Sequence, residues 1–379
     1  MQAAGYDNVA PREKLIGGSM KLKLKKRDHL KKKQNFAKFK RKVRSRIKKR
    51  CRRKGISISD RRTLYYISVP KAMNVEGAGN RKDVIRFFDK LRKRAIVDNG
   101  RVILDFGETR FITAPAMLLF IAELDRIRRI CIDTFDIRIS NVIDKNVKHV
   151  LIQIGFYELC GQTPPRISSD NFADNVRHWQ FASGERIDDD TNRAFDAIEG
   201  RIAPEARKGI WRGFSEALVN SVQHAYVARR GTRDSQTAVK RWWMFTEERQ
   251  GTLTVAVCDL GIGIPRSLPL NWGESILAQI QSRLPLGTGP DVRSLRIALE
   301  VGQTRTGAQY RGRGLPQIWQ AVRGSEGSGI MILSNKARIA WGSKTDREYE
   351  TEFSDSIHGT LVMWTVKTAQ EDSSDANVH

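Results

Sequence analysis

The sequence has no closely spaced cysteines. Its 379 residues include four, Cys51, Cys131, Cys160 and Cys258, and no two of them form a CxxC pair. Such a set lacks the ligand spacing of a zinc site and the dense pairing of a small disulfide-stabilised domain. We therefore expect reduced thiols and a cytoplasmic protein.

Long apolar runs are also missing. The longest, residues 114–122, is too short to cross a bilayer and contains Pro115. The N-terminal residues show no apolar core of the kind that a secretory signal peptide has. We expect no membrane partner.

Acidic residues are nearly missing from residues 21–54, the stretch that begins at Lys21 and ends at Lys54. It holds 20 Lys or Arg and a single acid, Asp28, a charge of +19 within a total of +25. Residues 1–20 have no net charge, so the basic character belongs to this arm. Apolar side chains inside the arm recur at spacings of three or four and predict a basic amphipathic helix.

Three interpretations of the arm remain open. It is a solvated tail without a partner, a helix on a membrane surface, or a segment that contacts nucleic acid or another polyanion. The third is favoured, because 20 positive charges would displace many counterions from a phosphate backbone. The apolar face is thin for a membrane helix, and no base-reading motif is present.

Strands alternate with helices over residues 63–160, which predicts a small α/β domain. The expected strands are 63–69, 102–106 and 135–140, and the expected helices are 81–95, 114–130 and 142–154. Residues 161–184 are rich in Pro, Ser, Asp and Asn and predict an irregular connection.

A second α/β domain is expected after this connection. Its predicted helices are 188–202, 211–229, 274–283, 293–301 and 315–323, and its predicted strands are 241–246, 252–258, 330–334, 337–341 and 360–366. We therefore divide the chain into an arm (1–60), a first domain (61–162), a linker (163–187), a second domain (188–368) and a polar tail (369–379).

The helix around residues 213–226 carries two opposed faces. Its apolar stripe includes Leu218 and Val222, and Glu216, Asn220 and His224 lie on the other side. A solvated surface is the simple interpretation of such a polar row. Few Lys or Glu residues stand in it, however, which favours a face turned toward a ligand.

Three glycine-containing motifs follow this helix. Asp259 ends a predicted strand and is followed by Gly261 and Gly263, which would fix a carboxylate at the rim of a sheet. Gly312, Gly314 and Leu315 follow a Gly-rich loop and open a helix, where backbone N–H groups can bind phosphate. Gly359 and Thr360 begin the last strand. Each motif alone is equally consistent with a structural turn.

The order ExxxN, DxGxG, GxGL and GT resembles the GHKL ATPase superfamily over roughly residues 190–366. That superfamily includes gyrase, heat-shock chaperone, histidine kinase and mismatch-repair ATPases. The text EALVNSVQHAY is most similar to the anti-sigma-factor serine kinases within it. The resemblance implies an α/β sandwich that binds ATP and Mg²⁺.

The resemblance also implies a role for each matching residue. Asn220 would coordinate Mg²⁺, Glu216 would be the general base, and Asp259 would bind the adenine amino group with Thr360 nearby. Gly261 and Gly263 would let the backbone approach the nucleotide closely. Gly312 and Gly314, with the 303–311 loop, would form a lid over the phosphates, and Leu315 completes that motif. His224 would be a supporting residue, and Arg305, Arg311 and Arg313 are weaker phosphate candidates.

The first domain resembles the STAS domain of anti-anti-sigma factors. The similarity lies in VILDFGETRFITAPAMLLFIAELD and in a later segment that ends VLIQIGFYELC. Thr113, Ala114 and Pro115 stand where that family has its Asp and phosphorylatable Ser. The similarity therefore implies a fold and a surface for a protein partner rather than a phosphoacceptor. An unrelated small α/β domain is the alternative.

Three functions remain open from the sequence. The chain is an ATPase switch, a serine/threonine kinase of the anti-sigma type, or an ATP-sensing module without turnover. A histidine kinase is disfavoured, because neither His149 nor His178 has the phosphoacceptor context of that family. Many members of the superfamily dimerise around ATP, so a homodimer is a further expectation.

Overall fold

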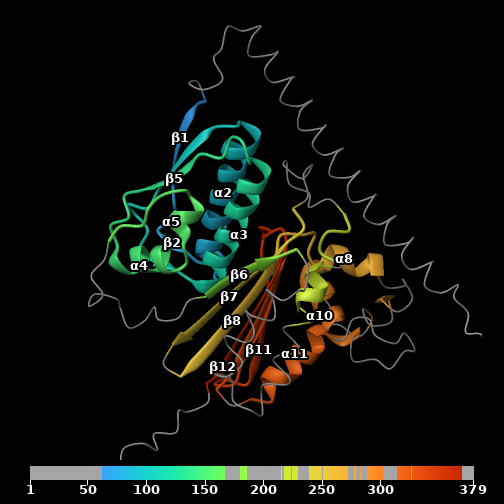
Figure 1. Ribbon diagram of the computed structural model, residues 1–379. Helices are drawn as coiled ribbons and strands as arrows, with labels where there is room; N and C mark the ends of the chain where they lie inside the picture. Colours follow the sequence, from blue (N-terminus) through green and yellow to red (C-terminus); the bar gives the residue numbers. More distant parts are fainter. Residues whose placement is uncertain are drawn as a thin grey trace, which may run out of the picture. The chain divides into compact units, whose positions relative to one another are not determined.

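The computed structural model describes residues 62–166, 180–185, 215, 217–222, 224–228, 239–249, 251–271, 277–278, 282, 288–301, 314–325 and 327–368 (Figure 1). The chain divides into two units, Met1–Arg62 and Thr63–His379. All but one of the described residues belong to the second unit. The predictions for the basic arm, the 188–202 helix, the 303–311 loop and the C-terminal tail lie outside the described residues.

A three-stranded parallel sheet forms the centre of the first part of this unit, residues 63–166. Its order is β1-β3-β5. The strands are β1 (Leu64–Ser68), β3 (Arg101–Asp105) and β5 (Ile137–Ser140). Parallel neighbours need a crossover, which α2 (Ala78–Arg92) and α3 (Ala114–Ile130) supply. One turn of π-helix, η1 (Lys93–Val97), follows α2.

Shorter elements complete this part. A two-stranded parallel pair joins β2 (Ala72–Met73) to β4 (Phe111–Ile112), and the helices α4 (Lys145–Gln153) and α5 (Phe156–Leu159) follow β5. The Asp144 carboxylate caps α4 by accepting a 3.0 Å hydrogen bond from the Val147 N–H. An N-cap of this kind satisfies one of the N–H groups that a helix leaves unpaired at its start.

The start of α3 lies at the position where the STAS resemblance places a phosphoacceptor. There Thr113 is the N-cap, and its hydroxyl accepts a hydrogen bond from the Ala116 N–H at 3.4 Å. Pro115 occupies the first turn, where its missing N–H costs no hydrogen bond. The sequence at this point therefore serves to begin a helix.

A seven-stranded sheet forms the second part of the unit, in the order β11-β10-β9-β12-β8-β7-β6. Every pairing in it is antiparallel. The strands are β6 (Gln180–Gly184), β7 (Trp242–Arg249), β8 (Thr252–Asp259), β9 (Gly329–Ser334), β10 (Ala337–Gly342), β11 (Arg347–Glu352) and β12 (Thr360–Lys367). The described helices of this part are α8 (Ile264–Asn271), α10 (Pro290–Val301) and α11 (Gly314–Arg323).

Both faces of the central strands of the large sheet are buried. On one face, side chains of β7, β8 and β12 such as Trp242, Val257 and Trp364 pack with residues of α10 and α11. On the other face, alternate residues such as Trp243 and Cys258 share a core with α2 and α3. Because successive residues of a strand point to opposite faces, β8 contributes to both cores, and its last five residues are all buried.

The contact between α3 and the large sheet contains buried charge. The Asp125 carboxylate of α3 accepts hydrogen bonds from Trp243 Nε1 at 3.0 Å and from Arg129 Nε at 2.8 Å. Two residues earlier in α3, Glu123 is 2% exposed and accepts a 2.6 Å hydrogen bond from Arg92 of α2. Buried carboxylates need such partners, because an unpaired charge in a protein interior is strongly unfavourable.

The sequence prediction of a mixed α/β protein is confirmed. The helix predicted over 114–130 has the observed bounds of α3, and the strands predicted in the second domain correspond to β7, β8, β9, β10 and β12 within three residues at each end. Several elements differ. Residues 180–184, predicted as irregular, form β6. The short elements β2, β4 and α5, and also β11 and α8, were not expected. Among the described residues, no helix has the length and apolar character needed to cross a membrane.

Trp243 offers a test of the packing between α3 and the large sheet. It is fully buried and donates its indole hydrogen bond to Asp125. We expect Trp243→Ala to lower the free energy of unfolding by about 3–5 kcal/mol, because it removes a large core side chain. Trp243→Phe keeps an aromatic ring and should cost about 1–3 kcal/mol, because the buried Asp125 carboxylate loses one of its hydrogen-bond donors. Urea unfolding followed by circular dichroism measures both.

The control for this pair is Ile143→Ser. Ile143 is 67% exposed, so its replacement should change the unfolding free energy by no more than about 0.5 kcal/mol. Equal losses for Trp243→Ala and Ile143→Ser would show that the packing described here is wrong.

Candidate functional site

The C-terminal end of β8 presents a buried carboxylate. Asp259 is the last residue of the strand and is 5% exposed. One of its oxygens, Oδ1, accepts a 2.9 Å hydrogen bond from the Gly261 N–H, which fixes the turn that follows. The other oxygen, Oδ2, lies 3.5 Å from the Ser221 hydroxyl. The carboxylate is therefore held between the end of the strand and the 217–222 helical segment.

Two hydroxyl side chains stand beside Asp259 on the neighbouring strands. Thr360 pairs with Asp259 across β12 and β8, and it also pairs with Ser334 across β12 and β9. Residues that face each other in an antiparallel pair point to the same side of the sheet. The Ser334 and Thr360 hydroxyl oxygens are 3.0 Å apart. Ser334, Thr360 and Asp259 thus form one polar row, which faces the α10 and α11 side.

Ser334 was missed by sequence reasoning. Its hydroxyl accepts a 2.8 Å hydrogen bond from the Ile264 N–H at the start of α8, so it joins the last residue of β9 to the glycine turn. The only signal in the sequence is a Ser at the end of an apolar strand. Its importance comes from strand pairing between segments far apart in the chain.

The polar helix of the sequence analysis is described at residues 215, 217–222 and 224–228. Residues 217–222 are helical, but residues 224–226 form a turn, so the prediction that the helix continues to residue 229 is wrong. Leu218 is fully buried in the core, whereas Val222 is 37% exposed and does not belong to the apolar stripe. Asn220 is half-buried, and its carbonyl accepts a 2.9 Å hydrogen bond from the His224 N–H. Glu216 lies outside the described residues.

The turn after this helix contacts the glycine turn after β8. The Ile262 N–H donates a 2.7 Å hydrogen bond to the Ala225 carbonyl. The Tyr226 hydroxyl accepts a 3.1 Å hydrogen bond from the Leu260 N–H and donates one to the Arg241 carbonyl. Burial, together with the nearby Asp259 charge, raises the pKa of Tyr226. The phenol therefore stays neutral and remains able to donate.

Two glycines are required here by close backbone approach. A Cβ at Gly261 would lie 2.1 Å from the Ala225 carbonyl oxygen, and a Cβ at Gly359 would lie 2.2 Å from the Asp259 carbonyl oxygen. Neither contact is possible for a real side chain, since the neighbouring atoms are backbone. The two glycines therefore allow the segment around Ala225, the turn after β8 and the start of β12 to meet at Asp259.

Gly263 is needed for a different reason. Its φ of +79° lies in the left-handed region, and a Cβ there would also lie 2.5 Å from the Asn335 side-chain nitrogen. Asn335 is the first residue of the two-residue turn between β9 and β10, and its side chain donates a 2.8 Å hydrogen bond to the Ile262 carbonyl. The glycine turn is thereby fixed from both sides.

The remaining predicted site residues lie at the start of α11 and before it in the sequence. Gly314 is the first residue of α11, and Leu315 packs half-buried against the core under that helix. Gly312 and the arginines Arg305, Arg311 and Arg313 lie outside the described residues. The structure thus brings Asn220, Asp259, Gly261, Gly263 and Thr360 into one region.

The hydrogen-bonding groups at Asp259 and Thr360 suit the edge of a purine. A carboxylate accepts a hydrogen bond from an exocyclic amine, and a hydroxyl such as that of Thr360 can donate to a ring nitrogen. Mg²⁺ takes oxygen ligands and usually keeps water and substrate phosphates among them, so an amide oxygen such as that of Asn220 is of a suitable kind. Among the described residues, no group of three or more His, Cys, Asp or Glu side chains is placed to hold a metal ion.

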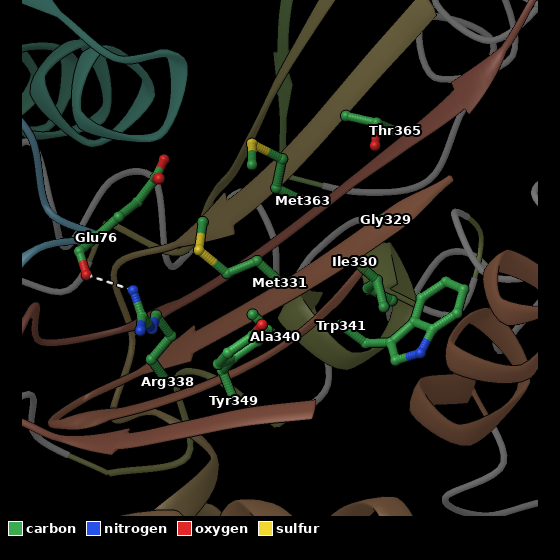
Figure 2. Close-up of a pocket in the computed structure, with 10 residues that line it drawn as sticks. All are labelled: Glu76, Gly329, Ile330, Met331, Arg338, Ala340, Trp341, Tyr349, Met363 and Thr365. Carbon is green, nitrogen blue, oxygen red and sulfur yellow. Dashed lines mark hydrogen bonds between the residues drawn. The ribbon is translucent and has the colours of Figure 1, made fainter. Parts of the chain in front are cut away.

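A separate hollow of about 290 Å³ lies on the opposite face of the sheet, over β9, β10 and β12 (Figure 2). Its lining is mainly apolar, with Met331 and Met363 among its residues. Arg338 donates a 2.6 Å hydrogen bond to the Glu76 carbonyl at one side of it. Burial raises the pKa of Glu76, partly offset by the Arg338 charge. None of the predicted site residues lines this hollow.

A substitution at Gly261 tests the close approach of the two turns. Gly261→Ala should lower the free energy of unfolding by about 1–3 kcal/mol, because a methyl group there overlaps the Ala225 backbone. Thermal unfolding of the purified variant measures the loss.

Gly79→Ala is the matched control, since it adds the same methyl group where nothing lies within 4 Å. Gly79 is inside α2, so alanine should raise stability there by about 0.5–1 kcal/mol. Gly261→Ala with unchanged or raised stability would contradict the contact.

Two comparisons with known proteins found no match. No model of a known protein family matches the chain, and no curated protein matches it in sequence.

Proposed function

We propose that residues 188–368 form a Mg²⁺-dependent ATP-binding domain of the GHKL type, with STAS-like residues 61–162 as its regulatory partner. The observation that carries the proposal is the meeting of three distant segments at Asp259. The helix of Asn220, the turn of Gly261 and Gly263, and the strand that begins at Thr360 contact one another there. The sequence resemblance assigns the same three segments to one nucleotide site.

Each residue has a chemical task in this proposal. Asp259 accepts a hydrogen bond from the adenine amino group, and Thr360 supports the same edge of the base. The Asn220 amide oxygen holds Mg²⁺, and Glu216 takes a proton from the attacking water or hydroxyl. When bound, MgATP supplies a transferable phosphoryl group. Closure of the lid around Gly312 and Gly314 would couple the bound nucleotide to conformation.

Substitution of Asp259 tests the adenine site. We expect Asp259→Asn to weaken MgATP binding by about tenfold to a hundredfold, because an amide nitrogen would face the adenine amine without accepting from it. Isothermal titration calorimetry measures the dissociation constant. Asp83→Asn is the control, since the Asp83 side chain is 65% exposed on α2. If the two variants bind MgATP with equal affinity, Asp259 is not part of the nucleotide site.

The outcome of the reaction is tested with γ-labelled ATP. An ATPase releases labelled phosphate, a serine/threonine kinase transfers the label to a protein, and an ATP-sensing module does neither. Glu216→Ala should abolish turnover by either route while MgATP still binds, because it removes the base alone. Full turnover in this variant would refute the assignment of Glu216.

The basic arm is proposed to bring the switch to nucleic acid or another polyanion. Removal of residues 1–54 should leave MgATP affinity unchanged and abolish salt-sensitive retention on a DNA or RNA oligonucleotide. The retention of the full chain should fall steeply between 50 and 200 mM salt, as expected when many phosphates are neutralised. A truncated chain that is retained as strongly as the full chain would contradict this role.

A further inference from the structure

Arg81 is the most deeply buried cation among the described residues, and the proposed reaction gives it no task. It lies in the first turn of α2 and is 1% exposed. Its guanidinium packs over the Phe353 ring, with 4.0 Å between the Cζ atom and the ring centroid. Burial lowers the pKa of Arg81 to about 10, so the side chain is still charged at neutral pH. A buried charge of this kind requires strong compensation from its surroundings.

The compensation comes from backbone carbonyls on both parts of the unit. Arg81 Nη1 donates to the Val75 carbonyl at 2.9 Å. Nη2 donates to the Asn335 carbonyl at 2.8 Å and to the Asp355 carbonyl at 3.2 Å. The Nε atom has no partner among the described residues. The fork of the guanidinium therefore joins the first turn of α2 to two turns of the large-sheet part.

Asn335 transmits this contact to the proposed nucleotide site. Its backbone N–H donates to the Gly359 carbonyl at 3.0 Å, and its side chain donates to the Ile262 carbonyl at 2.8 Å. Gly359 immediately precedes Thr360, and Ile262 lies between Gly261 and Gly263. Asn335 itself has a φ of +49°, a left-handed conformation that must be held by its surroundings. One residue thus ties together both turns beside Asp259.

We infer that Arg81 is a positioning residue through which the 61–162 part sets the nucleotide affinity of the site at Asp259. The inference rests on the proposed function and deepens it by naming the point of regulation. Arg81 touches no nucleotide. It holds Asn335, and Asn335 holds the two turns whose placement decides whether Asp259 and Thr360 meet the base. Any partner that displaces the first turn of α2 would weaken nucleotide binding by the same route.

Substitution of Arg81 in the full chain tests this inference. We expect Arg81→Met to raise the MgATP dissociation constant at least about tenfold, because methionine fills the space without donating to the Asn335 carbonyl. Arg81→Lys keeps one charged donor and should recover part of the affinity. Arg86→Met is the matched control, since Arg86 lies on the same helix with a 66% exposed side chain. Its affinity should equal that of the unmodified chain.

Calorimetry separates positioning from a loss of folding. A fraction that is irreversibly misfolded lowers the stoichiometry and leaves the dissociation constant unchanged. Reversible unfolding instead raises the apparent dissociation constant in inverse proportion to the folded fraction, which urea unfolding followed by circular dichroism measures separately. A folded variant in which the two turns beside Asp259 are misplaced gives full stoichiometry and a raised dissociation constant. If neither Arg81 variant folds, Asn335→Gly decides, because glycine accepts the left-handed φ while the hydrogen bond to Ile262 is lost. It should also weaken binding at least about tenfold.

The outcomes distinguish this inference from the proposed function. Absence of MgATP binding by the unmodified chain would refute the proposed function itself. If the unmodified chain binds and Asp259→Asn does not, unchanged affinity in Arg81→Met, or in Asn335→Gly where the Arg81 variants do not fold, would overturn the role of Arg81.

Discussion

Burial of the central strands of the seven-stranded sheet on both faces is the constraint on which the rest of the structure depends. A strand with two buried faces has no position for an unpaired polar side chain, so polar groups gather where the strands end. Asp259 lies at such an end, next to Thr360 and Ser334 on the adjacent strands. The polar row owes its compactness to the register of three strands, whose side chains must all point to the same face.

Because α2 and α3 cover one face of that sheet, the first part of the unit is packed against the second. Trp243 and Asp125 form one contact through a buried hydrogen bond, and Arg81 and Asn335 form another. Trp243 pairs with Cys258, the residue before Asp259, and Asn335 bonds to Gly359 and Ile262 in the turns around Asp259. Interiors of this density do not deform smoothly, so a change in one part is expected to reach the other as a shift between discrete arrangements.

Much of this fold could be predicted because its strands and helices have strong local patterns. The helix α3 has a dense apolar sequence, which predicted its bounds, and the structure adds that Thr113 caps its start. The edge strand β11 was not expected, because its alternating charges contribute little apolar surface. Its pairing with β10, which supplies the partner hydrogen bonds, holds it in the sheet. The strand β6 lies in a short polar stretch and is likewise defined by its pairing with β7.

The sequence by itself determined the α/β class, because local periodicity is a property of short segments. It also predicted Asn220, Asp259 and Thr360 as site residues through the resemblance in the order of the motifs. Only the tertiary structure decided that Ser334 completes the polar row and that Arg81 reaches Asn335, 254 positions away along the chain. Those contacts depend on strand register and on the packing of one part against another. No local pattern encodes either, since both arise from pairing between segments that are distant in sequence.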